Sequence, residues 1–361
     1  MISDLIKPHI QKLHPYQSAR DIYKDVSGIL LDANENSFGS VAGDSVSLMN
    51  LNRYPDPHQI KLRKALSDYI KVDAEKLFFG VGSDEIIDLL MRLFCSHGKD
   101  SVMIVEPTYG MYTTVANIQN IEINSVLLDE NFGLNAGKVL TNVSASDRII
   151  FLCSPNNPTG NLLEKNEISL IAEKFKGIVV VDEAYIDFAD DDASAVSLIN
   201  EYKNIVILRT FSKAWGLAAV RCGYAIADEV ITSYLFKIKA PYSINVMTEQ
   251  IILKALSKFE EKNKFVELIV KERDFLITEL SKIVFVKNIF PSDANYILIK
   301  LDFAKEVQKM MMHRGVIIRD RSTQPLLEDC LRITVGTRAE NIKMIEKMIE
   351  VYNEISGGQN A

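Results

Sequence analysis

Thr210-Phe-Ser-Lys-Ala-Trp-Gly-Leu-Ala-Ala-Val-Arg-Cys-Gly-Tyr224 follows an apolar run, Ile205 to Leu208, whose length and β-branched content are typical of a buried strand. Lys213 is therefore expected just beyond the C-terminal end of a strand, where open α/β sheets bind their ligands. An apolar setting makes a lysine amine easier to deprotonate, and a neutral amine can form a Schiff base with an aldehyde. Further along, the guanidinium of Arg221 offers a rigid fork of donors that suits a phosphate.

An amine that binds an aldehyde and a guanidinium that binds a phosphate together indicate pyridoxal phosphate. A lysine after a serine is a weak signal by itself, because the chain holds 41 lysine and arginine residues and most of them must be solvated. The interpretation therefore depends on whether other segments supply the remaining contacts for this cofactor.

Gly80-Val-Gly-Ser83 leads into a helical pattern that extends from Asp84 to Phe94. The free N–H groups of such a turn and the positive end of the helix dipole suit an anion. The segment matches neither a nucleotide-binding loop nor a dinucleotide fingerprint, because no Gly-Lys pair follows and Glu85 stands at the third glycine position. Taken alone, Ser83 is better explained as an N-cap.

Two more predicted strands end in polar residues that suit a cofactor ring. One leads into the turn Ser154-Pro-Asn-Asn-Pro-Thr-Gly160, in which Asn157 can donate a hydrogen bond to a phenolic oxygen. The other, Gly177-Ile-Val-Val-Val-Asp-Glu-Ala-Tyr185, ends at Asp182, a carboxylate that can cap a helix or keep a pyridine nitrogen protonated. Because one strand-helix-strand unit separates Asp182 from Lys213, both side chains are expected at one edge of the sheet.

The composition is that of an ordinary folded protein, with 361 residues, 47% hydrophobic and 25% charged, and the length suits two domains. A net charge of −7 argues against nucleic-acid binding, which needs an excess of basic groups. No apolar run approaches the ~20 residues that span a bilayer, and no signal peptide is evident, so we expect a cytoplasmic protein without a membrane partner. The four cysteines and five histidines are scattered, which predicts neither disulfides nor a metal site.

Alternating strand and helix patterns from roughly residue 75 to residue 235 predict a mainly parallel, helix-covered sheet and thus an α/β fold. Asn245 to Leu280 is typical of one long helix. A smaller α+β unit follows, with strands expected at Ile283 to Val286 and Leu331 to Val335, and Thr337-Arg-Ala-Glu340 predicts a capping box for the last helix. The expected domains are an N-terminal arm that contributes to the small domain (1–40), a large cofactor-binding domain (41–265) and a small C-terminal domain (266–361).

Arg319 and Arg332 each interrupt an otherwise apolar strand pattern. A buried arginine is costly unless it is paired, so each is expected either in a buried ion pair or at an anionic substrate. The sequence leaves both explanations open.

Several fragments carry a resemblance along nearly the whole chain, namely Pro15-Tyr-Gln-Ser-Ala-Arg20, Asp32-Ala-Asn-Glu-Asn36, Arg53-Tyr-Pro-Asp56, Ser154-Pro-Asn-Asn-Pro-Thr-Gly160 and Leu331-Arg-Ile-Thr-Val-Gly336. With the lysine stretch they resemble the fold type I aminotransferases that depend on pyridoxal phosphate, and within them the class II family of histidinol-phosphate aminotransferases. The resemblance implies a large domain with a mainly parallel seven-stranded sheet plus a smaller α+β domain.

The resemblance also implies roles for single residues. Lys213 would bind the cofactor covalently and act as the catalytic base, Asp182 would face the pyridine nitrogen, and Tyr185 would bond the phenolic oxygen. The residues implied to bind the cofactor are Tyr54, Gly82, Ser83, Asp84, Tyr109, Asn157, Asp182, Tyr185, Ser212, Lys213 and Arg221, with Tyr54 supplied by the second protomer of a homodimer. The residues implied to bind the substrate are Tyr16, Asn34, Arg319 and Arg332.

Two features depart from the simplest pattern. The carboxylates of Asp84 and Glu85 suit a neighbouring phosphate only if their side chains point away from it. Trp215, beside the lysine, is bulkier than the resemblance implies, which leaves the shape of the pocket open.

The activity that the resemblance implies is transfer of the amino group of L-histidinol phosphate to 2-oxoglutarate, giving imidazole acetol phosphate and L-glutamate in histidine biosynthesis. Aminotransferases of aromatic amino acids and a decarboxylase of threonine phosphate share the scaffold and its lysine, so both remain alternatives. A regulator that binds the cofactor without turnover is another, which the lack of a basic helix-turn-helix extension disfavours.

Overall fold

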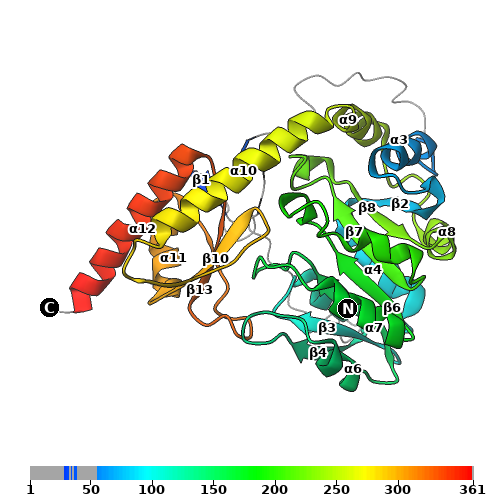
Figure 1. Cartoon of the computed structure of the whole chain (residues 1–361), viewed down its shortest axis with the longest axis horizontal. Coiled ribbons are helices and arrows are strands. Elements are labelled where there is room, and N and C mark those ends of the chain that lie inside the picture. Colours follow the sequence, from blue (N-terminus) through cyan, green and yellow to red (C-terminus); the bar gives the residue numbers. More distant parts are fainter. Residues whose placement is uncertain (1–27, 32–33, 35, 39–54, 360–361) are drawn as a thin grey trace, which may run out of the picture.

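The computed structural model of the chain describes residues 28–31, 34, 36–38 and 55–359, without the side chains of Leu30 and of residues 356–359. Two sheets with their helices lie side by side, and the long helix α10 (Phe259–Leu280) runs from one to the other (Figure 1). Tyr16 and Tyr54, both predicted site residues, lie outside the described residues.

The larger sheet is the predicted mainly parallel, seven-stranded one. Its strand order is β2-β8-β7-β6-β5-β3-β4. β8 runs antiparallel to both of its neighbours, and the other paired strands are parallel. The strands are β2 (Leu77–Gly80), β3 (Ser101–Glu106), β4 (Glu122–Leu127), β5 (Asp147–Cys153), β6 (Ile178–Asp182), β7 (Ile205–Thr210) and β8 (Gly223–Ala227).

Helices cover both faces of this sheet, which explains why its central strands are continuous apolar runs. Alternate residues of β3 enter opposite cores, with Met103 and Val105 in one and Val102 and Ile104 in the other. The first core is covered by α3 (Ile60–Ile70), α6 (Ala136–Thr141), α7 (Lys165–Lys174) and α9 (Val246–Leu256), the second by α4 (Gly82–Phe94), α5 (Met111–Gln119) and α8 (Glu229–Ile238). Short 3-10 helices occur at η2 (Ala74–Lys76), η3 (Ile186–Phe188), η4 (Ala195–Asn200) and η5 (Ala218–Val220).

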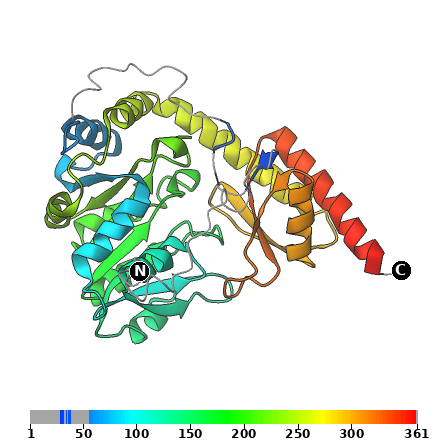
Figure 2. The same ribbon diagram turned by 180° about the vertical axis from the view of Figure 1, so that it is seen from behind.

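The smaller sheet is antiparallel, in the order β12-β13-β10-β9. Helices α10, α11 and α12 pack around it, as the view from behind also shows (Figure 2). A parallel pair, β1 with β11, ties the N-terminal segment to this unit. The elements are β1 (Ile29–Leu30), β9 (Val286–Phe290), β10 (Tyr296–Leu301), α11 (Ala304–His313), β11 (Val316–Ile317), β12 (Arg319–Asp320), β13 (Cys330–Thr334) and α12 (Arg338–Gln359).

Three local predictions differ from the structure. The expected helix from Asn245 to Leu280 is two helices, because α9 ends at Leu256 and α10 begins at Phe259. The strand expected at Ile283 to Val286 is wrong. That segment is a turn, with Val284 99% exposed, and the strand begins at Val286.

The prediction that Ser83 is an N-cap is also wrong. Val81 is the N-cap of α4, and the carboxylate of Glu85 reaches back to accept its N–H at 2.6 Å. The capping box before α12 is confirmed, since Glu340 accepts the N–H of Thr337 at 2.7 Å and Thr337 Oγ1 accepts the N–H of Glu340 at 3.4 Å.

Gly223 lets β8 run close to the turn that opens α4. A Cβ atom at this position would lie 2.5 Å from the backbone nitrogen of Ser83 and 2.8 Å from the carbonyl carbon of Gly82. Backbone atoms cannot move aside as the end of a side chain can. The glycine is therefore required for the approach of these two segments.

Gly223→Ala is expected to lower the free energy of unfolding by about 1–3 kcal/mol, the usual cost of forcing an extra carbon into a packed site. Urea titration followed by circular dichroism measures the change. Gly110→Ala is the matched control, because no atom lies within 4 Å of a Cβ there and φ is −66°. Equal stability of the two variants would contradict the prediction.

Candidate active site

The candidate site lies at the C-terminal ends of the central strands β5, β6 and β7. Cys153, Asp182 and Leu208 are neighbours across these strands. The segments that carry the predicted cofactor ligands therefore leave the sheet side by side, as expected for the ligand-binding edge of an open α/β sheet.

Asp182 is a buried carboxylate at the end of β6, with 2% of its surface exposed. It accepts hydrogen bonds from the hydroxyl of Tyr112 at 2.8 Å and from the N–H of Ala184 at 3.1 Å. Burial raises the pKa of Asp182 to about 6, because the ionised form has lost its hydration. A cation held beside this carboxylate would therefore be strongly favoured.

The hydroxyl of Tyr185 lies between two amides. It accepts hydrogen bonds from Nδ2 of Asn34 at 3.1 Å and from Nδ2 of Asn157 at 3.3 Å. Burial raises the pKa of Tyr185 to about 12, so the hydroxyl keeps its proton at neutral pH. With both lone pairs engaged, that proton is available to an oxygen acceptor.

Lys213 is half-buried in the loop after β7, and its Nζ lies 5.7 Å from the centre of the Tyr185 ring. The loop is fixed by backbone and side-chain contacts. Leu217 donates its N–H to the carbonyl of Phe211 at 3.0 Å, and Asn36 donates Nδ2 to the carbonyl of Ala214 at 3.1 Å. The amine is thus held beside the tyrosine that follows β6.

Trp215 packs in the protein core, where its side chain is 3% exposed. Its ring centre lies 5.5 Å from those of Tyr69 and Phe211 and 5.5 Å from Nζ of Lys262. Lys262 also pairs with Asp187 at 3.0 Å. The bulk of the tryptophan therefore anchors the lysine loop to the core.

Arg221 lies beside the first turn of α4, whose backbone N–H groups lack partners within the helix. A Cβ atom on Gly82 would lie 2.6 Å from Nη2 of Arg221, so the glycine makes room for the guanidinium. Arg221 itself has a left-handed backbone, with φ at 52°. Nearby, the hydroxyl of Ser212 accepts from Thr210 at 3.0 Å. The guanidinium and the first N–H groups of α4 therefore suit an anion.

The two acids in the first turn of α4 differ in direction. Glu85 turns back toward Val81, away from the guanidinium. Asp84 points toward it, because its carboxylate accepts from Nη2 of Arg221 at 3.4 Å and from the hydroxyl of Tyr109 at 3.1 Å. The ring of Tyr109 meets that of Tyr112 edge-on, with centres 5.6 Å apart.

The predicted substrate arginines face each other across two strands. Arg319 of β12 is the direct partner of Arg332 of β13, so both side chains are on one face of the sheet. Arg332 is 3% exposed and donates to Oδ1 of Asn157 at 2.6 Å. Like charges at opposed positions repel, so this pair favours an acidic ligand.

The sequence did not indicate Tyr112 or Thr334, which support the site. Tyr112 lies in the first turn of α5, three residues after Tyr109, which precedes the helix, and this spacing could have indicated that the two rings are close. Thr334, in β13, donates its hydroxyl to Oδ1 of Asn34 at a distance of 2.7 Å. No local pattern in the sequence predicts that contact.

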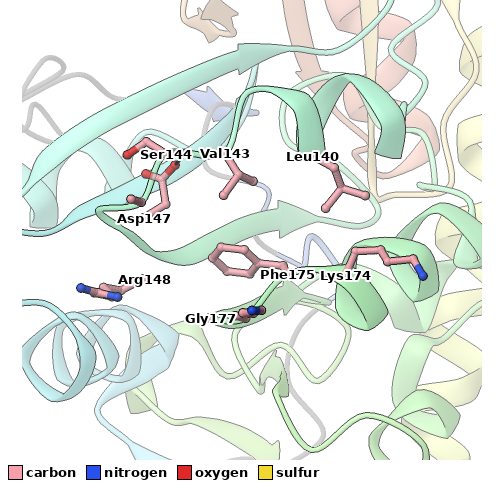
Figure 3. Close-up of a pocket in the computed structure, with 10 residues that line it drawn as sticks. Leu140, Val143, Ser144, Asp147, Arg148, Lys174, Phe175 and Gly177 are labelled. Carbon is pink, nitrogen blue, oxygen red and sulfur yellow. Dashed lines mark hydrogen bonds between the residues drawn. The ribbon is translucent and has the colours of Figure 1, made fainter.

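A pocket of about 410 Å³ lies at the opposite edge of the sheet, beside the starts of β5 and β6. Figure 3 shows the ring of Phe175 between Val143 and Gly177. Asp147 in its wall is already bonded to the N–H of Ser144 at 2.7 Å and to Nδ2 of Asn124 at 2.8 Å. Because this pocket lies at the starts of the strands, it is separate from the candidate site at their C-terminal ends. Within the described part of the chain, no helix is long and apolar enough to cross a membrane.

Comparison with known proteins agrees with this geometry. Residues 27–348 match the family "Aminotransferase class I and II". A histidinol-phosphate aminotransferase of Cytophaga hutchinsonii is 48% identical over 96% of this chain and 97% of its own. The crystal structure of the Clostridium acetobutylicum histidinol-phosphate aminotransferase superimposes with a TM-score of 0.82 at 26% identity, over 90% of this chain and 99% of the other.

The fold is shared more widely. The histidinol-phosphate aminotransferase of Sinorhizobium meliloti, solved with pyridoxal-5'-phosphate, has a TM-score of 0.86 at 22% identity and covers 97% of this chain and 98% of its own. With the sheet, the buried acid and the lysine loop described above, these matches establish that the chain belongs to the class I and II aminotransferases and, within them, to the histidinol-phosphate aminotransferase family.

Proposed function

We propose that this protein transfers the amino group of L-histidinol phosphate to 2-oxoglutarate with pyridoxal phosphate as cofactor, in the biosynthesis of histidine. The observation that carries the proposal is a buried acid and a loop lysine that follow neighbouring strands, with an arginine beside the first turn of α4, in a chain 48% identical to a histidinol-phosphate aminotransferase. The products are imidazole acetol phosphate and L-glutamate.

The donor set fits the cofactor. Arg221, Ser212 and the first N–H groups of α4 suit its phosphate, and the glycine at position 82 leaves space for the guanidinium. The buried carboxylate of Asp182 suits a protonated pyridine nitrogen. Tyr185 and Asn157 suit the phenolic oxygen.

When bound, pyridoxal phosphate supplies an aldehyde that accepts the amino group and a ring that draws electrons from the substrate carbon. Lys213 supplies the amine for that aldehyde and, once displaced, takes the proton from Cα of the substrate. Tyr185 would donate a hydrogen bond to the phenolic oxygen, and Asp182 would hold the ring nitrogen in its charged form. Tyr109 is proposed to cover one face of the ring.

Both substrates are acids, and the facing arginines suit both. Arg332, supported by Arg319, would bind the phosphate of histidinol phosphate in one half-reaction and a carboxylate of glutamate in the other. A guanidinium can form paired hydrogen bonds with either group. Asn34 and Tyr16 complete the proposed substrate contacts, Tyr16 on the grounds of sequence alone.

A homodimer is part of the proposal. Val230, Tyr234 and Ile238 recur at every fourth position of α8 and are 61%, 46% and 40% exposed. Tyr242 and Met247, 44% and 42% exposed, follow along the chain. An apolar stripe of this kind marks a protein interface. We infer that a second copy covers it, with Tyr54 passing between the protomers.

The expected domain division, an arm at 1–40, a cofactor domain at 41–265 and a small domain at 266–361, also belongs to the proposal. This division is supported by the separation of the seven-stranded sheet from the four-stranded one. A cytoplasmic location is supported by the four cysteines, which are all free thiols.

An amine screen tests the reaction. L-Histidinol phosphate is expected to convert the visible spectrum of the lysine-bound cofactor to that of pyridoxamine phosphate, and threonine phosphate and aromatic amino acids are expected to have little effect. Lys213→Ala should abolish both the starting absorbance and turnover. Carbon dioxide release from threonine phosphate would favour the decarboxylase, and full activity of Lys213→Ala would contradict the scheme.

The pH dependence of stability tests the burial of Asp182. Its pKa is raised to about 6, so in protein freed of cofactor the folded state holds a proton that the unfolded state has lost, and stability falls as pH rises from about 4 to 6. The expected fall is about 3 kcal/mol. Urea titrations at several pH values should show that Asp182→Asn lacks this fall in stability. Bound pyridoxamine phosphate should also remove the fall from the wild type. An identical pH dependence of wild type and variant would count against the prediction.

The double variant Val230→Glu, Tyr234→Glu is expected to dissociate the dimer, because two charges cannot be buried unpaired in an apolar interface. Sedimentation equilibrium measures the change. Leu170→Glu on α7, at a position 38% exposed, is the control and should leave the dimer intact. A wild-type monomer, or a variant that stays dimeric, would exclude this surface.

A further inference from the structure

We propose that the carboxylate of Asp84 competes with the cofactor phosphate for Arg221, and so weakens every phosphate ligand of the site, which keeps weakly bound anions such as inorganic phosphate from occupying it. The inference rests on the proposed cofactor binding. It concerns the side chain of Asp84, whereas the family resemblance concerns only its position at the start of α4.

The contacts of Asp84 define the competition. One carboxylate oxygen accepts from Tyr109 at 3.1 Å, and the other lies 3.4 Å from Nη2 of Arg221. The same guanidinium is the strongest cationic donor available to a phosphate at this end of α4. A phosphate bound there must share Arg221 with a negative group or displace it.

Two effects of the carboxylate oppose each other. It orders the guanidinium before the phosphate arrives, and it repels the phosphate afterwards. The first effect is small, because the contact is long and the two side chains are 48% and 35% exposed. The second is screened by the same exposure, but it is stronger because a phosphate carries about two negative charges and the guanidinium only one positive charge. The net effect of Asp84 on the binding of a phosphate is therefore unfavourable.

The occupancy of the site follows from this balance. An inorganic anion gains only the contacts of the phosphate site, and the repulsion by Asp84 offsets much of that gain. Pyridoxal phosphate gains in addition the contacts of its ring and the bond to Lys213. The carboxylate therefore weakens both ligands by a similar factor, which leaves the ratio of their affinities unchanged, but only the cofactor has enough other contacts to stay bound.

Asp84→Asn tests the inference, since the amide oxygen can still accept from Tyr109 while the charge is lost. The full-length protein is freed of cofactor and titrated with inorganic phosphate by calorimetry and with pyridoxamine phosphate by fluorescence. Binding of both ligands is expected to tighten by about tenfold. Asp88→Asn, one turn further along α4 and paired with Arg92 at 2.7 Å, removes the same charge and should change neither constant.

Thermal stability separates this role from a structural one. Loss of an acid in the first turn removes a favourable interaction with the helix dipole, so Asp84→Asn should melt slightly lower while it binds more tightly. Unchanged or weaker binding by Asp84→Asn would overturn the inference. Failure of the wild type to develop visible absorbance with pyridoxal phosphate would instead overturn the proposed cofactor.

Discussion

The burial of a negative charge at the end of β6 is the constraint on which the site depends. Asp182 is 2% exposed and receives one hydroxyl and one backbone N–H, which replace only part of its lost hydration. The remaining cost can be offset by a cation in a fixed place, and a protonated ring nitrogen is such a cation. The parallel strands supply the fixed place, because β5, β6 and β7 end at one edge and need no strained loop to bring their ligands together.

The lysine loop is braced from the side of the core. Lys262 of α10 bonds Asp187 at 3.0 Å and lies over the ring of Trp215, so one helix holds both the segment after β6 and the loop after β7. Burial opposes the charge of Lys262, but Asp187 and Tyr69 together outweigh burial, so the pKa of Lys262 is raised. Ala214 and Tyr185 belong to a further apolar cluster, distinct from the two cores of the larger sheet, which also contains residues of the smaller unit. Lys213 is thus fixed relative to both sheets.

The sequence was sufficient for the parts of the molecule that local patterns determine. Each central strand is a continuous apolar run, so the edge that carries Asp182 and Lys213 could be predicted. Contacts between segments that are distant in the chain could not be predicted from the sequence. The bond from Tyr112 to Asp182 spans 70 residues, and the direction of Asp84 depends on Arg221, 137 residues away. The break between α9 and α10 was missed because hydrophobic periodicity continues across it.

Asn157 links Arg332 of the smaller sheet to Tyr185. Its Oδ1 accepts from Arg332 at 2.6 Å, and its Nδ2 donates to the hydroxyl of Tyr185 at 3.3 Å. An acid that binds Arg332 competes with Oδ1 for the same guanidinium, and any turn of the amide that follows alters the donor available to Tyr185. In the proposed reaction, the acidic end of a substrate would therefore be linked to Tyr185 through one amide. A ligand without that acid leaves Arg332 paired with Asn157, so the contact between these two side chains would distinguish acidic ligands from others.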